Sequence, residues 1–203
     1  MYTTFFDRFG QTVSSNSEKP ALVFEGDQLS YAEVDEKSDL LARALFAKGI
    51  KKGNIVPILL ERGVDAVVAM LGVLKSGAAM CNISIDYPLD RIDYICHDIS
   101  AKFIIDAGFM ERLDELPQME SEIEIGPSDP AVVVYTSGST GYPKGVLLSH
   151  QTMNMSLADT LCGFTAEESF LLIASLSFIG GDHLCPFPVS GRANAPFGKR
   201  SYM

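Results

Sequence analysis

Tyr135-Thr-Ser-Gly-Ser-Thr-Gly-Tyr-Pro-Lys-Gly145 is the stretch of this sequence that decides its fold and its chemistry. The residues before it, 131–135, are apolar and β-branched, which predicts a buried central strand. Residues 146–148 are apolar as well and are predicted to pair with that strand as a hairpin. Glycines at 138, 141 and 145 allow positive φ and let the backbone approach a ligand without a Cβ clash. A glycine-rich loop between two strands is therefore expected.

The side chains of this loop are suited to an anion. Four hydroxyl groups can donate hydrogen bonds, successive backbone N–H groups can form an anion-binding nest, and Lys144 adds a positive charge. The predicted ligand is a polyphosphate, and the candidate phosphate-binding residues are Thr136, Ser137, Gly138, Ser139, Thr140, Gly141 and Lys144. A turn without a ligand is the alternative that composition alone would favour.

The loop differs from the P-loop of nucleoside triphosphatases. That motif is G-x-x-x-x-G-K-[ST] running into a helix. Here Pro143 precedes Lys144, Gly145 follows it, and a strand is predicted next. A hairpin loop is therefore expected in place of a cradle at a helix terminus.

Strands and helices alternate at short spacing along the rest of the chain. Ser30 and Glu33 have the spacing of a capping box, which predicts the start of a helix that ends at Gly49. Strands are predicted at 54–60, 78–83, 102–106 and 170–177, and helices at 64–74, 89–99 and 151–161, with a short helix and a surface connection in 108–129. Pro57 must occupy a position where the sheet needs no N–H. The fold class predicted is α/β, a largely parallel sheet flanked by helices.

Composition excludes several function classes. The formal net charge of −10 argues against binding to nucleic acid or to an anionic membrane surface. No apolar run approaches the ~20 residues of a transmembrane helix. The cysteines, at 81, 96, 162 and 185, form no C-x-x-C pair, which suits free thiols in a reducing cytoplasm. His183 with Cys185, and Cys96 with His97, lack a second pair at zinc-site spacing, so no metal site is predicted.

The ordered string at 135–145 resembles the phosphate-binding signature of the adenylate-forming (AMP-binding) superfamily. Residues 29–34 (Leu-Ser-Tyr-Ala-Glu-Val) resemble the first motif of peptide-synthetase adenylation domains. Residues 74–79 (Leu-Lys-Ser-Gly-Ala-Ala), followed by Asp86-Tyr-Pro88 and Arg91, resemble the second. The chain is thus most similar to the N-terminal part of a non-ribosomal peptide synthetase adenylation domain. The two upstream motifs are interpreted as structural.

The resemblance implies an ATP-dependent ligase. A carboxylic or amino acid would attack the α-phosphate of ATP to give acyl-AMP, and a thiol of CoA or of a carrier's phosphopantetheine would then take the acyl group. The loop would hold the β- and γ-phosphates, with Thr140 and Lys144 in direct contact, and Mg²⁺ would share the charge. The adenine-binding and Mg²⁺-linked motif, the ribose-binding aspartate and the catalytic lysine of the family have no match here. Catalytic residues are therefore unassigned, and the isolated chain is expected to be inactive.

The resemblance also implies a domain division. Residues 1–179 would be a partial, truncated N-terminal subdomain of the adenylate-forming fold. Residues 180–203 are interpreted as a tail, because three basic residues and one acidic residue there reverse the sign of the charge. The incomplete sheet is expected to expose edges and apolar faces, which promotes association.

Two departures from the family pattern concern the substrate. Ser84 replaces an acidic residue at the end of the second motif, and Ile179 follows Phe178 where a Phe-Asp pair often binds the substrate amine. His183 is interpreted as incidental. Two alternatives stay open: a fragment of an acyl-CoA synthetase, and a non-catalytic nucleotide-binding remnant or interaction module.

Overall fold

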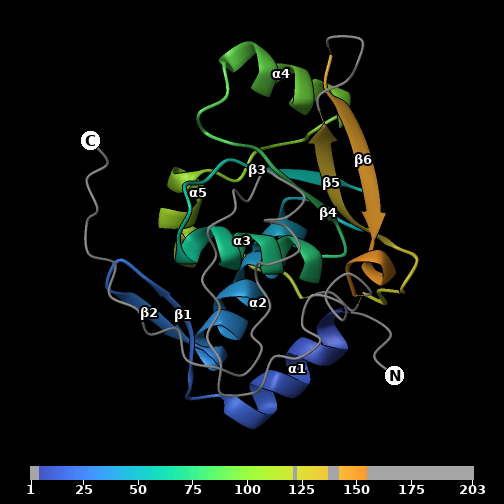
Figure 1. The fold of residues 1–203 in the computed structure, drawn as a ribbon. Coiled ribbons are helices and arrows are strands. Elements are labelled where there is room, and N and C mark those ends of the chain that lie inside the picture. The colour runs from blue at the N-terminus through green and yellow to red at the C-terminus, as the bar shows by residue number, and fades with distance from the viewer. Residues whose placement is uncertain (1–4, 121–122, 137–141, 155–203) are drawn as a thin grey trace, which may run out of the picture.

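The computed structural model describes residues 5–120, 123–136 and 142–154. The helices are α1 (Phe5–Asn16), α2 (Tyr31–Ala47), α3 (Val64–Lys75), α4 (Leu89–Asp98), α5 (Ala107–Glu111) and the 3₁₀ turn η1 (Leu113–Glu115). The strands are β1 (Pro20–Phe24), β2 (Asp27–Ser30), β3 (Ile55–Ile58), β4 (Ala79–Asn82), β5 (Pro130–Thr136) and β6 (Lys144–Ser149). Figure 1 shows their arrangement.

The main sheet of the described residues is mixed. Its strand order is β3-β4-β5-β6. β3 pairs with β4 and β4 with β5 in parallel, whereas β5 and β6 form an antiparallel hairpin. The α/β class and the largely parallel sheet predicted from the sequence are confirmed.

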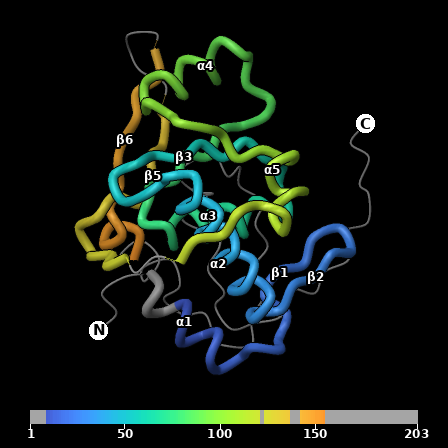
Figure 2. Tube along the Cα trace, turned by 180° about the vertical axis from the view of Figure 1, so that it is seen from behind, coloured from blue at the N-terminus to red at the C-terminus, as the bar shows by residue number. Residues whose placement is uncertain are grey.

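Helices cover both faces of this sheet. Neighbouring strand residues point to opposite faces, and in β5 Val132 and Val134 join the core on the α2 and α3 side. Val133 joins a second cluster with Ile92 and Ile95 of α4. The structure is thus layered, with α2 and α3 on one face and α4 on the other, as Figures 1 and 2 show from front and back.

The predicted helix boundaries are well supported by local chemistry. The Ser30 hydroxyl caps Glu33 N–H of α2, and the Glu33 carboxylate accepts from Ser30 N–H at 2.7 Å, so the capping box is confirmed. Gly49 and Gly77 end α2 and α3 with φ of 75° and 74°, a conformation that favours glycine.

Pro57 lies in β3 without breaking the sheet. Its carbonyl accepts from Ile105 N–H at 3.0 Å, on the side of β3 that faces away from β4. The N–H and C=O of one strand residue point to the same side, so the position of the missing Pro57 N–H also faces away from β4 and no bond to β4 is lost. The positional requirement predicted for this proline is met.

The strand predicted at 102–106 is wrong. Only Ile105 bridges to β3, through Ile58. Asp106 immediately caps α5, because its carboxylate accepts from Phe109 N–H at 2.8 Å, and this cap ends the extended segment after one bridge. The short helix predicted within 108–129 is present as α5 and η1.

Three elements near the N-terminus were not predicted. They are α1 and the β1–β2 hairpin, whose turn places Glu25 and Gly26 at φ of 49° and 103°. Residues 150–154 are helical, which agrees with the start of the helix predicted at 151–161. The rest of that predicted helix lies outside the described residues. The predicted strand at 170–177 and the tail at 180–203 also lie outside them.

Candidate functional site

The β5–β6 hairpin carries the candidate phosphate loop. Tyr135 pairs with Gly145, and Thr136 pairs with Lys144, at the end of the hairpin where the loop leaves and returns. Of the predicted phosphate-binding residues, Thr136 and Lys144 are described and lie opposite each other. Ser137, Gly138, Ser139, Thr140 and Gly141 lie outside the described residues. The antiparallel hairpin predicted from the sequence is confirmed.

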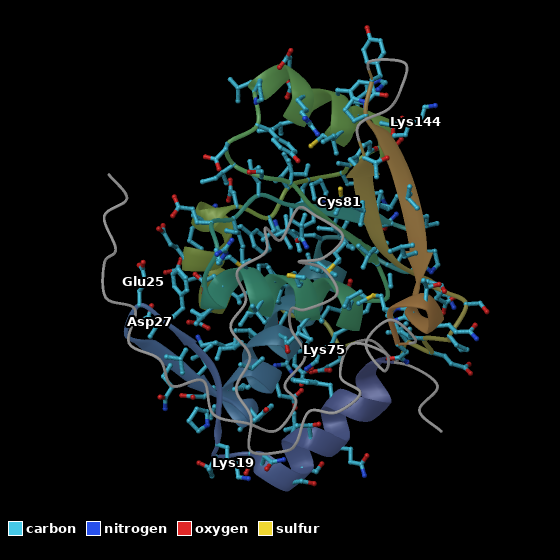
Figure 3. The ribbon with its side chains drawn as sticks, viewed as in Figure 1. Lys19, Glu25, Asp27, Lys75, Cys81 and Lys144 are labelled. Carbon is cyan, nitrogen blue, oxygen red and sulfur yellow. The ribbon has the colours of Figure 1, made fainter. Side chains whose placement is uncertain are left out.

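Both described site residues are exposed at the hairpin end. The Thr136 hydroxyl donates to the Lys144 carbonyl oxygen at 3.4 Å, a long hydrogen bond across the two strands. Figure 3 shows Lys144 at the loop end of the hairpin, well away from Lys75 between the lower helices. An exposed ammonium beside a hydroxyl can contact an anionic ligand with little desolvation cost.

Gly145 lets the Tyr135 ring lie close to β6. A Cβ built on Gly145 would fall 3.2 Å from Tyr135 Cζ and 3.3 Å from Val133 Cγ1, tighter than ordinary contact. The glycine that follows Lys144 therefore has a packing role here.

Helix α4 contacts β5 and the two residues that lead into β6. The Tyr135 hydroxyl donates to Asp98 Oδ2, at the last residue of α4. The Tyr94 hydroxyl donates to the Pro143 carbonyl oxygen at 3.3 Å, and its ring centroid lies 5.6 Å from that of Tyr142. Sequence reasoning missed these contacts, although Tyr94 and Asp98 are four residues apart in the predicted helix and so share a face.

The environment of Tyr135 keeps its phenol protonated. Burial raises the pKa of Tyr135, and the hydrogen bond to Asp98 and the negative charge of Asp98 raise that pKa further. Tyr135 therefore stays a hydrogen-bond donor at physiological pH.

The upstream motifs have structural contacts. Ser30 and Glu33 cap α2, and Gly77 makes the turn from α3 to β4. At the end of the second motif, Ser84 Oγ accepts from Asp86 N–H at 3.3 Å, and the Arg91 guanidinium lies 3.9 Å from the Tyr87 ring centroid. These contacts shape the turn that leads into α4.

No metal site is found in the part of the chain that the structure describes. Within it, no group of three or more His, Cys, Asp or Glu side chains is arranged to hold an ion. Cys81 is buried in the sheet, and Cys96 of α4 is a free thiol of intermediate exposure. Likewise, none of the described helices combines the length and apolarity needed to cross a membrane.

Comparison with known proteins gives consistent matches. The family model described as AMP-binding enzyme matches residues 9–194. Tyrocidine synthase 1 of Brevibacillus parabrevis is 35% identical over 190 residues, which are 84% of this chain and 18% of that protein. The chain thus spans less than a fifth of this relative's length.

Solved structures match the fold. The N-terminal subdomain of NpsA from Klebsiella oxytoca, in complex with 3-hydroxybenzoyl-AMSN, aligns with a TM-score of 0.76 at 26% identity over 87% of this chain and 49% of that one. The O-succinylbenzoate coenzyme A synthetase of Bacillus subtilis, in complex with AMP, aligns with a TM-score of 0.78 at 23% identity over 86% of this chain and 51% of that one, and this likeness shows the fold alone. The sheet and helices described above are thus those of an N-terminal subdomain, of which the chain covers about half.

Proposed function

Because this chain belongs to the AMP-binding enzyme family, we propose that it supplies the phosphate-binding part of a ligase that activates a carboxylic or amino acid as acyl-AMP. One observation carries the proposal. Thr136 and Lys144 flank the signature loop and pair with each other in register, so both face the same end of the hairpin. A cation and hydroxyl groups gathered at one loop suit a nucleoside triphosphate.

The loop residues would bind the β- and γ-phosphates of ATP. Lys144 would neutralise negative charge, Thr140 would contact phosphate directly, and Thr136, Ser137 and Ser139 would add hydroxyl donors. Gly138 and Gly141 would let backbone N–H groups approach the phosphates. Attack of the acid on the α-phosphate is an in-line displacement that depends on positioning and charge neutralisation more than on a protein nucleophile.

The described residues fit ATP better than they fit its metal. Exposed Lys144 and Thr136 suit a phosphate group. For Mg²⁺ the described residues hold no cluster of carboxylates. We therefore assign Mg²⁺ no residue in this chain and expect it to accompany the nucleotide.

The acceptor of the acyl group is proposed to be a carrier protein's phosphopantetheine. The two upstream motifs resemble peptide-synthetase adenylation domains, and tyrocidine synthase 1 is a relative at 35% identity. Transfer to CoA is the second candidate, because the signature loop at 135–145 also resembles that of acyl-CoA synthetases. No nucleic acid or membrane partner is proposed.

Residues 1–179 are proposed as the family-like unit and 180–203 as a tail. A cytoplasmic location is proposed, because the four cysteines of the sequence form no C-x-x-C pair. The family motifs for adenine, ribose and the catalytic lysine have no match in the sequence, so we propose that these 203 residues alone do not complete the reaction.

Calorimetric titration with ATP and Mg²⁺ tests the phosphate site. The chain is expected to bind, and Lys144→Ala is expected to weaken binding at least tenfold, because a charged hydrogen bond contributes about 1.5–3 kcal/mol. Lys102→Ala is the matched control, since Lys102 is also exposed but lies near Asn54. Equal affinity of Lys144→Ala and wild type would refute the assignment of Lys144.

Exchange of labelled pyrophosphate into ATP tests the activity. With Mg²⁺ and a panel of carboxylic and amino acids, we expect no substrate-dependent exchange by the 203-residue chain. Exchange would show that the chain is catalytically complete. ATP binding without exchange is also what a non-catalytic nucleotide-binding module would show. Adding the complementary remainder of an adenylation domain therefore distinguishes the two, because only an enzyme fragment would recover exchange.

A further inference from the structure

Helix α4 is bonded to β5 and to the residue that precedes β6, on either side of the phosphate loop. Tyr135 donates to Asp98 immediately before Thr136, and Pro143 accepts from Tyr94 immediately before Lys144. Each contact therefore lies one residue from a proposed phosphate-binding side chain. The contacts come from one face of α4, because Tyr94 and Asp98 are separated by one helical turn.

Helix α4 is itself fixed to the sheet. Ile92 and Ile95 are 6% and 1% exposed, and they pack with Cys81, Ile83 and Val133. Figures 1 and 2 show α4 beside the loop end of the hairpin from both sides. Tyr94 and Asp98 thus project from an element whose own position is set by buried apolar contacts.

Among the described residues, the side-chain contact that joins the two strand ends directly is a long one. Thr136 and Lys144 are exposed, and the hydrogen bond between the Thr136 hydroxyl and the Lys144 carbonyl is 3.4 Å long. Val146 and Leu147, the next large side chains of β6, are 42% and 55% exposed. The strand ends would therefore have more freedom without the two tyrosine contacts.

Gly145 completes the arrangement. It pairs with Tyr135, and a Cβ placed on it would lie 3.4 Å from the Tyr135 hydroxyl oxygen as well as 3.2 Å from Cζ. The absence of a side chain there leaves space for the end of the ring that reaches Asp98.

We propose that Tyr94 and Asp98 are positioning residues that hold Thr136 and Lys144 in place for phosphate binding, Asp98 acting through Tyr135. The inference rests on the proposed function, since it assigns these residues to the same ATP site. The Tyr135–Asp98 hydrogen bond is exposed and the Tyr94–Pro143 hydrogen bond is only partly buried, and one such bond contributes about 0.5–1.5 kcal/mol to global stability. Their loss is therefore expected to affect ligand binding more than unfolding.

The test measures ATP affinity and stability in the same variants. Tyr135→Phe and Asp98→Ala are each expected to weaken binding of ATP with Mg²⁺ about fivefold, the effect of one lost hydrogen bond. Tyr94→Phe is expected to act in the same direction, and Tyr94→Phe/Tyr135→Phe more strongly than either. The urea midpoint of unfolding is expected to stay close to that of wild type.

Matched controls separate positioning from general effects. Asp93→Asn removes the same charge from an exposed position on α4, and Tyr87→Phe removes a hydroxyl but keeps the ring beneath Arg91. Both controls are expected to bind ATP like wild type. Unchanged affinity in Tyr135→Phe and Asp98→Ala would overturn the proposal, and so would equal weakening in Asp93→Asn.

Limited trypsin digestion supplies a readout that needs no nucleotide. Cleavage after Lys144, measured against cleavage after exposed Lys102 in the same sample, is expected to be several-fold faster in Tyr94→Phe/Tyr135→Phe than in wild type. Unchanged relative cleavage would overturn the anchoring by α4. Wild type that fails to bind ATP would instead refute the proposed function for this chain, with digestion still deciding whether α4 holds the strand ends.

Discussion

Gly72 of α3 lies directly against Leu41 of α2. A Cβ built on Gly72 would fall 2.5 Å from Leu41 Cδ2 and 2.6 Å from Leu41 Cβ. Leu41 belongs to the main core and is 0% exposed, and Gly72 is buried in α3. The glycine therefore sets how closely the two helices pack, although glycine is unfavourable within a helix.

Gly72→Ala is expected to destabilise the chain by about 1–3 kcal/mol, because the added methyl group clashes with the Leu41 Cβ, which no rotamer change can move. Urea denaturation measures the loss. Gly10→Ala in α1 is the control, since no atom lies within 4 Å of a Cβ there. It is expected to be neutral or stabilising by up to about 1 kcal/mol, and a Gly72→Ala variant of wild-type stability would contradict the close packing.

Removing the capping box of α2 is also expected to lower the free energy of unfolding. Ser30→Ala is expected to cost about 1 kcal/mol, because Glu33 N–H loses its side-chain acceptor at 3.2 Å. Ser14→Ala is the matched control, because its hydroxyl only bonds back to the Gly10 carbonyl within α1. Equal urea midpoints for the two variants would show that the cap contributes nothing.

His150 predicts a pH dependence of stability. The pKa of His150 is lowered from 6.5 to about 4, mainly by burial, while the charge of Asp129 opposes this shift and that of Lys52 adds to it. Between these values the unfolded chain binds a proton that the folded chain does not. Stability is therefore expected to fall as the pH drops from about 6.5 toward 4, by on the order of 3 kcal/mol at the lower end.

Urea denaturation at pH 7.5, 6, 5 and 4.5 measures this slope. The lowered pKa of Asp129, caused first by its hydrogen bond to Lys52, acts in the same direction but only as the pH approaches or passes below the ordinary carboxyl value of 3.8. His150→Gln is expected to flatten the slope, whereas His97→Gln, at an exposed position of α4, is expected to retain it. A slope that survives in His150→Gln would assign the titration to another group.

The exposed apolar side chains of the edge strand β6 lead us to expect that copies of the chain associate. Strand β6 is the last strand of the described sheet, and Val146 and Leu147, which point to opposite faces, are both exposed. Leu147→Lys is expected to reduce concentration-dependent association in size-exclusion chromatography with light scattering. Leu89→Lys is the control, because Leu89 is 78% exposed but lies on α4. A wild-type chain that stays monomeric at every concentration would refute this prediction.

Much of the fold followed from local patterns. The apolar spacing of α3, the capping box at Ser30 and the glycines at 49 and 77 are read within a few residues of each other, so they located elements correctly. The apolar pattern at 102–106 led to a wrong strand prediction. Asp106 caps α5 instead of extending the strand, and strand propensity does not show this competition between cap and strand. The β1–β2 hairpin was missed, although Glu25-Gly26-Asp27 directly after the apolar run 21–24 is a turn signal.

The sequence by itself determined that the strands on either side of residues 137–143 form a hairpin, because this depends on residues that are neighbours along the chain, and the structure added the register that pairs Thr136 with Lys144. Only the tertiary structure decided that α4 contacts this hairpin. Tyr135 and Asp98 are 37 residues apart, and Tyr94 and Pro143 are 49 apart. These pairs meet because buried Ile92 and Ile95 hold α4 against the face of β4 and β5, and such packing between distant segments leaves no periodic trace in the sequence.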